Sequence, residues 1–235
     1  MVDMKTYVVN LDKSVERLAR ITQQLNELGM TFVRVPAVYG ASLSKQERKR
    51  DFARFHSMLA MRRKLLDGEI GCALSHDKIY RKMKSEGIEI ALVLEDDVIV
   101  LPIIKDVLAR IEEFVDKQKP QVFILSCYDN GRCQKTEIEP IHNATCSDGY
   151  VITLPAARAI FDVNYPVVTV ADSWHRWEKR LGLQIYQCMP APVRQYCLGE
   201  FHSVIQGEAK GTKAIGVSAR DAAHKLKEFL CRLKV

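Results

Sequence analysis

Residues 90–97, with the sequence IALVLEDD, decide the fold, because five apolar residues run directly into three carboxylates. A continuous apolar run of this kind is typical of a central strand buried on both faces of a sheet. Adjacent carboxylates disfavour one another's ionisation, so they are costly unless something neutralises them. The stretch predicts an α/β domain in which a buried strand carries an acidic cluster at its carboxyl end.

The acidic cluster Glu95, Asp96 and Asp97 is a candidate site for a divalent cation. On an extended chain, residues i and i+2 point to the same side, so Glu95 and Asp97 are expected to face one site as metal ligands. Asp96 is then expected to face the other way or to bond to loop amides. Carboxylate oxygens suit Mg²⁺ or Mn²⁺, and ligands of open α/β sheets bind at the carboxyl ends of the strands. The alternative is a solvated acidic turn.

The patterns around this strand fit a parallel sheet. Residues 6–11 (TYVVNL) and 32–35 are expected to be strands on either side of a helix that Asp12 and Ser14 can cap and Gly29 ends. This unit is about 30 residues long, as parallel pairing requires. Further along, the sequence predicts helices over residues 68–84, 102–117, 155–161 and from 218 onward, and strands over 122–125 and 148–153.

Residues 43–66 form a polar and basic segment in which only Glu47 and Asp51 oppose the cations. The simplest interpretation is a solvated helical insertion. The alternative is a surface that meets anionic lipid head groups or phosphorylated glycans. The basic residues of the segment are Lys45, Arg48, Lys49, Arg50, Arg54, Arg62, Arg63 and Lys64.

The composition limits the classes of protein that the chain can belong to. Its 235 residues fit one large α/β domain or two small ones, and a hydrophobic fraction of 47% argues against disorder. No apolar run approaches the roughly 18 residues that span a membrane, and the first residues do not resemble a signal peptide, so we expect a cytoplasmic protein. The net charge of +6 indicates an anionic partner. No nucleic-acid-binding module is recognisable, so a nucleic acid is not the expected partner.

The seven cysteines are irregularly spaced and include no CxxC pair, so they are expected to be free thiols. A zinc site built from Cys127, Cys133, His142 and Cys146 is the alternative, although it lacks the usual short paired spacings.

The segment GEIGCALSH at residues 68–76 leads into the helix before the acidic strand. Its glycines allow a close approach of the backbone to a ligand, and Ser75 and His76 lie early on the helix. The alternative is a glycine turn followed by a histidine of the core.

These motifs together resemble glycosyltransferase family 25, which includes bacterial lipooligosaccharide galactosyltransferases. GEIGCALSH is followed by VLEDDV at 93–98, and three further stretches agree in order: YVVNLDKSVER at 7–17, VPAVYG at 35–40 and DGYVITLPAARAI at 148–160. The resemblance covers roughly residues 5–175, and the C-terminal portion matches poorly.

The resemblance implies a GT-A-like α/β fold with a single, mostly parallel central sheet flanked by helices. It implies one domain over residues 1–235, with a nucleotide-sugar-binding half to about 125 and an acceptor-side half beyond. The expected donor is UDP-galactose, the cofactor Mn²⁺ or Mg²⁺, and the product of inverting transfer a β-galactoside on an oligosaccharide or lipid-linked glycan. Such an enzyme would work at the cytoplasmic face of the inner membrane, in contact with anionic lipid. The residues implied in donor binding are Asn10, Arg17, Ala37, Gly40, Gly71, Ser75, His76, Glu95 and Asp96.

Inverting transfer also needs a base for the acceptor hydroxyl. The first candidate is Asp172 in VTVADSWHRW, which follows an apolar run and lies beside aromatic rings able to stack on a sugar. Its alternative role is to cap the helix that begins at Ser173. Asp148 is the second candidate. His202, in EFHS, is either a further metal ligand or a surface histidine. A non-catalytic nucleotide- or glycan-binding protein on the same fold is the competing hypothesis, and the intact acidic cluster weighs against it.

Overall fold

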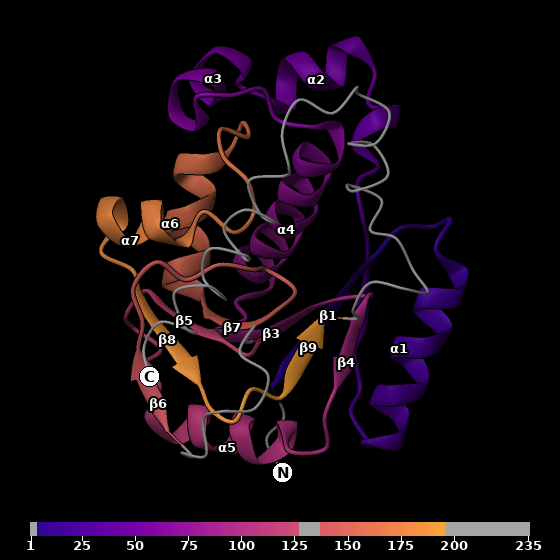
Figure 1. Cartoon of the computed structure of the whole chain (residues 1–235), viewed down its shortest axis with the longest axis vertical. Coiled ribbons are helices and arrows are strands. Elements are labelled where there is room, and N and C mark those ends of the chain that lie inside the picture. The colour runs from indigo at the N-terminus through magenta and orange to yellow at the C-terminus, as the bar shows by residue number, and fades with distance from the viewer. Residues whose placement is uncertain (1–3, 127–136, 196–235) are drawn as a thin grey trace, which may run out of the picture.

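The computed structural model describes residues 4–126 and 137–195, which are built around a seven-stranded sheet (Figure 1). Across the sheet the strands are β2 (Val33–Pro36), β1 (Lys5–Asn10), β3 (Ile90–Glu95), β7 (Gly149–Thr153), β5 (Gln121–Ile124), β8 (Gln184–Cys188) and β6 (Ile138–Pro140). Only β7 and β6 run against the others, because each pairs antiparallel with its neighbours. The predicted mostly parallel sheet is therefore confirmed. A separate pair, β4 (Val98–Val100) and β9 (Val193–Gln195), is antiparallel.

Helices cover both faces of the sheet, as the α/β class requires (Figure 1). On one face lie α4 (Asp67–Glu86), α6 (Leu154–Asn164) and α7 (Trp174–Leu181), and on the other α1 (Val15–Glu27) and α5 (Ile104–Phe114). Alternate residues of β3 divide between the two cores: Ala91 and Val93 pack toward α4, and Leu92 and Leu94 toward α1. All four are fully buried. The prediction of a central strand buried on both faces is confirmed, and this division explains its continuous apolar sequence.

Helix α1 begins after Ser14, as the sequence predicts, but the Ser14 hydroxyl makes no capping hydrogen bond. Instead the Asn10 side-chain amide donates to the backbone oxygen of Ser14 at 3.0 Å. The end of β1 and the start of α1 are therefore joined by a side chain that also reaches the acidic cluster.

The basic segment is a helical insertion, as predicted, and stands at one end of the molecule beyond α4 (Figure 1). It consists of α2 (Lys45–Asp51) and α3 (Arg54–Met61), and the short 3₁₀ helix η1 (Gly40–Ser42) directly precedes it. A capping box between Ser44 and Glu47 starts α2. A bridge between Phe52 and Val167 and a small apolar cluster around Leu74 attach the insertion to α4 and to the segment after α6.

Cys72, Cys146 and Cys188 are free thiols, which confirms the prediction for these three. The proposed zinc site cannot be placed, because Cys127 and Cys133 lie outside the described residues, as does the predicted C-terminal helix. Among the helices of residues 4–126 and 137–195, none combines the length and the apolar character that crossing a bilayer requires.

Candidate active site

The acidic cluster lies at the carboxyl edge of the sheet, where the sequence places it. β1 and β3 are parallel and end side by side at Asn10 and Glu95. Because β7 is antiparallel to β3, its start meets the same edge, and the backbone amide of Glu95 donates to the oxygen of Asp148 at 2.8 Å. This reversal brings a fourth carboxylate, Asp148, beside the cluster.

The three consecutive carboxylates surround one cavity. Asp96 and Asp97 form the turn between β3 and β4, and both line a cavity of about 90 Å³ together with Glu95. The expectation that Asp96 faces away or bonds to loop amides is wrong. Alternation of side chains holds only along an extended backbone, and the chain turns directly after Glu95.

Two side chains from the start of the chain hold the turn. Asn10 is 1% exposed and donates to Asp96 at 2.6 Å, while its own oxygen accepts from Arg34 at 2.8 Å. One guanidinium nitrogen of Arg17 lies 3.3 Å from a carboxylate oxygen of each of Asp96 and Asp97. Arg17 therefore neutralises part of the negative charge, yet burial still raises the pKa of Asp96.

Burial raises the pKa of both Asp97 and Asp148. Burial, followed by the charge of Glu95, raises the pKa of Asp97 to about 7. Burial raises the pKa of Asp148 to about 6, although the Ser126 hydroxyl donates to it at 2.6 Å. Oδ1 of Asp97 is buried and accepts no hydrogen bond from the described residues. An added positive charge would favour the ionised form of both side chains.

These residues fit a divalent cation of the Mg²⁺ or Mn²⁺ kind. Such ions take hard oxygen ligands, and the cavity offers the carboxylates of Glu95 and Asp97, the latter with its orphaned buried oxygen. Glu95 and Asp97 are the side chains that would hold the ion, and the assignment remains a prediction.

A buried chain of hydrogen bonds lies behind Glu95. Nε2 of His76 is 3.5 Å from Oε1 of Glu95, and its Nδ1 is hydrogen-bonded to the Tyr150 hydroxyl at 2.7 Å. Tyr150 is in turn 2.9 Å from the hydroxyl of Tyr80. The potential metal-binding atoms of Cys72, His76 and Glu95 lie within 4.8 Å of one another. Sequence reasoning did not group them, although the spacing of Cys72 and His76 places both on one face of α4.

Two glycines of the predicted donor-binding set have a packing role. A Cβ at Gly40 would come within 1.7 Å of the backbone oxygen of Asp67, and one at Gly71 within 2.4 Å of that of Val38. The glycines thus let the loop before η1 press against the start of α4. At Gly71 the close approach is between two stretches of backbone, and the predicted approach to a ligand stays a prediction.

The Ser75 hydroxyl fixes the same loop, because it accepts from the amide of Val38 at 2.8 Å and donates to the oxygen of Gly71 at 2.6 Å. Of the residues predicted to bind the donor, three pack behind the cavity and the others line it. Those behind are Asn10, Gly71 and His76; those lining it are Arg17, Ala37, Gly40, Ser75, Glu95 and Asp96.

Tyr39 is a lining residue that sequence reasoning missed. Its ring is 37% exposed, and Nζ of Lys13 lies 3.5 Å from the ring centroid. The sequence could have indicated this residue, because Tyr39 is the aromatic residue of the VPAVYG motif. The contacts of Gly40 and Gly71 hold the loop that carries it in place.

The candidate base Asp172 is half-buried, and its carboxylate accepts from the backbone amide of Cys146 at 3.4 Å. The neighbouring Ser147 donates its hydroxyl to Glu95 at 3.0 Å. Asp172 thus contacts the segment that touches the cluster, but it is not among the described residues lining the cavity. His202 lies outside the described residues.

The comparison with known families decides the affiliation. The profile of glycosyltransferase family 25, described as an LPS biosynthesis protein, matches residues 3–174. The chain belongs to glycosyltransferase family 25. The match includes all the motifs that carry the resemblance seen in the sequence and stops at the start of α7.

Two relatives in the family are animal proteins much longer than this chain. A "Glycosyltransferase 25 family member" of Aedes aegypti is 35% identical over 108 residues, which are 45% of this chain and 18% of that protein. "Procollagen galactosyltransferase 1-B" of Xenopus laevis is 32% identical over 101 residues, 40% of this chain and 16% of that protein. The chain therefore spans less than a fifth of the length of either relative.

Solved structures give weaker likenesses. A glycosyltransferase involved in glycosylation of the major capsid of PBCV-1 has a TM-score of 0.40 at 10% identity, over 88% of this chain and 97% of that one. A putative glucose-1-phosphate thymidylyltransferase from Bacillus anthracis has a TM-score of 0.44 at 12% identity, over 92% and 97%.

Proposed function

We propose that this member of glycosyltransferase family 25 is a metal-dependent galactosyltransferase that uses UDP-galactose. The observation that carries the proposal is the cavity in which Glu95, Asp96 and Asp97 meet at the carboxyl edge of the sheet. An acidic cavity repels a diphosphate unless a cation lies between them. The name of the Xenopus relative supports galactose as the sugar.

The transfer breaks the bond between the anomeric carbon and the diphosphate oxygen and forms a bond from that carbon to the acceptor oxygen, with inversion. A bound Mn²⁺ or Mg²⁺ would stabilise the charge that develops on the leaving UDP. Glu95 and Asp97 would hold the ion, and Arg17 and Asn10 keep the turn in place. The proton of the acceptor hydroxyl passes to a carboxylate, for which Asp172 and Asp148 are the candidates.

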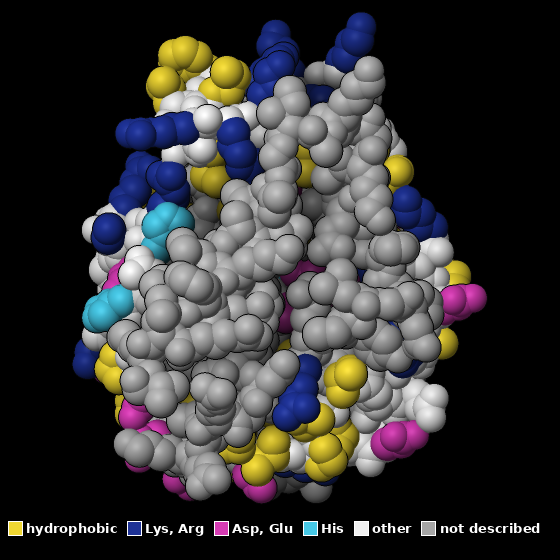
Figure 2. All heavy atoms as spheres, in the orientation of Figure 1, with side chains coloured by type: hydrophobic (Ala, Val, Ile, Leu, Met, Phe, Trp, Pro, Cys, Tyr) yellow, Lys and Arg dark blue, Asp and Glu magenta, His cyan; other side chains and the backbone are white. Residues whose placement is uncertain are grey.

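The proposed acceptor is an oligosaccharide or a lipid-linked glycan of the lipooligosaccharide type, reached from the cytoplasmic face of the inner membrane. The family description as an LPS biosynthesis protein supports this acceptor class. The basic insertion supports an approach to anionic lipid, since its lysines and arginines gather at one end of the molecule (Figure 2).

A panel of nucleotide sugars, each incubated with the protein and Mn²⁺ or EDTA, tests the proposal. We expect release of UDP from UDP-galactose with Mn²⁺, little release with EDTA, and much slower release from the other sugars. Nucleotide binding without any hydrolysis or transfer would favour the non-catalytic alternative. Hydrolysis that EDTA leaves unchanged would contradict the metal assignment.

A further inference from the structure

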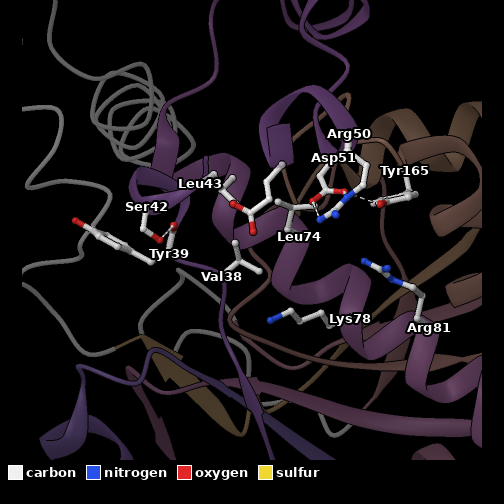
Figure 3. Close-up of a pocket in the computed structure, with 11 residues that line it drawn as sticks. Val38, Tyr39, Ser42, Leu43, Arg50, Asp51, Leu74, Lys78, Arg81 and Tyr165 are labelled. Atoms are coloured by element: carbon white, nitrogen blue, oxygen red, sulfur yellow. Dashed lines mark hydrogen bonds and ion pairs between the residues drawn. The ribbon is translucent and has the colours of Figure 1, made fainter. Parts of the chain in front are cut away.

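A second and larger cavity lies beside the acidic one, between the basic insertion and α4. Its volume is about 470 Å³ (Figure 3). Val38 and Tyr39 line both cavities, so the two are neighbours across the loop before η1. A group bound in the larger cavity would therefore lie next to the proposed site of sugar transfer.

Two acidic side chains line this cavity, and one of them, Asp51, is neutralised by Arg50. Asp51 accepts two hydrogen bonds from Arg50, both at 2.8 Å, and one from the Tyr165 hydroxyl at 2.6 Å. Arg50 with its hydrogen bonds, ahead of the opposing burial, holds the pKa of Asp51 below its usual range. Glu47 accepts from the amide and hydroxyl of Ser44 at 2.8 and 2.7 Å. Asp51 therefore needs no further cation, while Glu47 keeps its negative charge at the side of the cavity that α2 forms.

Two cations of α4 line the cavity, and the charges of Asp51 and Asp12 act on Arg81 and Lys78 from beyond ion-pair distance. Lys78 and Arg81 are one helical turn apart, and Figure 3 shows both reaching from α4 into the lower part of the cavity. Nζ of Lys78 donates to the backbone oxygen of Pro36 at 2.8 Å, and the Arg81 guanidinium lies 4.7 Å from the ring centroid of Tyr165. Among the residues the structure describes, no carboxylate forms an ion pair with either. Like charges three residues apart repel, and burial followed by the charge of Arg81 lowers the pKa of Lys78.

The ring of Tyr165 borders the cationic part of the cavity, and Tyr39 lies on its other side (Figure 3). Tyr39 is 37% exposed at the boundary with the acidic cavity, and Tyr165 stands over Arg81. Exposed tyrosine rings offer an apolar face and a polar tip to a ligand that has both, such as a sugar. Stacked on Tyr165, the Arg81 guanidinium is pre-oriented for a bidentate contact with an oxyanion.

We propose that this cavity is an acceptor subsite for a phosphorylated sugar, with Lys78 and Arg81 binding the phosphate and Tyr39 contacting the sugar ring. Two cations match a phosphate monoester, which carries a charge near −2, better than they match a single carboxylate. That the bound sugar acts as an acceptor rests on the proposed function. The preference for a phosphorylated sugar follows from the residues of the cavity alone.

Calorimetry at low salt with methyl glucoside 6-phosphate as the probe, without nucleotide or metal, tests the subsite. We expect the unaltered chain to bind it about tenfold or more tightly than neutral methyl glucoside or methyl glucuronide. Lys78→Gln and Arg81→Gln should each weaken binding about tenfold, and Arg81→Lys, which keeps the charge, much less. Lys84→Gln, an exposed lysine of α4 away from the cavity, is the matched control and should change nothing.

Three results would overturn the inference: equal binding of the neutral glycoside, equal binding of the glucuronide, or variants at Lys78 and Arg81 that bind as tightly as the unaltered chain. If inorganic phosphate binds as tightly as the phosphorylated glycoside, the claim that the cavity also contacts the sugar ring is wrong. Hydrolysis of UDP-galactose by the unaltered chain, measured without acceptor, tests the transferase proposal independently of the proposed sugar-phosphate subsite. If hydrolysis is absent while the phosphorylated glycoside binds through Lys78 and Arg81, the transferase proposal fails and the ligand chemistry of the cavity remains.

Discussion

Two aspartates beyond the acidic turn, Asp148 and Asp172, are held differently. Asp148 is 5% exposed, accepts a hydrogen bond from Ser126, and has a pKa raised by burial to about 6. Asp172 is half-buried and accepts from the amide of Cys146. A base must reach the acceptor hydroxyl and titrate near the working pH. The raised pKa favours Asp148 and the greater exposure favours Asp172.

Replacing each carboxylate by its amide distinguishes the two. If Asp172 is the base, Asp172→Asn should lower transfer about 10²–10⁴-fold, while UDP and Mn²⁺ binding stay unchanged, since a base touches the acceptor and not the diphosphate. Near-normal transfer by this variant would shift the role to Asp148. Loss of UDP binding would instead place Asp172 in the donor site. Asp162→Asn, an exposed position on α6, is the control.

Asp77 on α4 is a buried acid whose effect on stability can be measured through pH. It is 1% exposed, and burial raises the pKa of its carboxyl to about 8, against the opposing charge of Arg81. In the unfolded chain an aspartate titrates near about 3.9. Because the folded pKa is the higher one, the residue's contribution to stability is full below about pH 4 and is lost as the pH rises to about 8.

Asp77→Asn removes this titration. The melting temperature of the variant relative to the unaltered chain should therefore rise between about pH 4 and pH 8 and then level off. A gain of about 1 kcal/mol, or roughly 2–4 °C, is the least that we expect across this range. Thermal unfolding followed by circular dichroism at several pH values measures it, with Asp162→Asn as the exposed comparison. A difference that does not change with pH would contradict the assigned cause.

At the scale of elements, α3 combines features of a surface that meets a membrane. Phe55, Met58 and Leu59 are 70%, 45% and 65% exposed on this short helix. Figure 2 shows apolar side chains beside the dark blue ones that gather at the α2 and α3 end of the molecule. Apolar side chains that enter the head-group region, surrounded by lysine and arginine, are how interfacial helices bind anionic lipid.

Co-sedimentation with anionic vesicles should therefore retain the protein at low salt and release it as the salt concentration rises. The double variant Phe55→Ser and Leu59→Ser should bind at least about tenfold less, because each apolar side chain contributes up to about 1.5–3 kcal/mol when it leaves water completely. Val15→Ser removes a comparably exposed side chain from α1 and should bind normally. Failure of the unaltered chain to bind anionic vesicles at low salt would exclude the membrane role.

The elements with strong local signals were predicted, and those defined by pairing were not. The apolar run of β3 and the glycine that ends α4 are readable locally. β8 and β6 lie at one side of the sheet, and their sequences QIYQC and IEP carry no clear alternation, because few of their side chains are buried. The direction of β7 is likewise set by its antiparallel pairing with β3 and β5, which the local sequence does not reveal. Hence Asp148 could be named as a candidate, but its place beside Glu95 could not be derived.

At the scale of the whole molecule, the acidic cavity is an assembly of distant segments. β1 and α1 supply Asn10 and Arg17, the turn after β3 supplies Asp96 and Asp97, and the loop before η1 closes the side on which Gly40 and Gly71 touch. The carboxylates were predictable because they are consecutive. Their neutralisation by Arg17 was not, since an ion pair across 79 residues leaves no local pattern. The larger cavity was missed for the same reason.

This assembly predicts that donor binding depends on metal. Three carboxylates around one cavity repel a diphosphate, and Arg17, already shared between Asp96 and Asp97, offsets only part of that charge. Calorimetry should therefore detect UDP binding with Mn²⁺ and at least tenfold weaker binding with EDTA.

Asp97→Asn should lower the Mn²⁺-dependent affinity by a similar factor and abolish transfer. The variant should still fold normally, because the substitution removes an acid whose pKa burial raises to about 7. Asp162→Asn should match the unaltered chain in both assays. Equal affinity for UDP in Mn²⁺ and in EDTA would eliminate the metal site, and an Asp97→Asn chain that unfolds would give this residue a structural role instead.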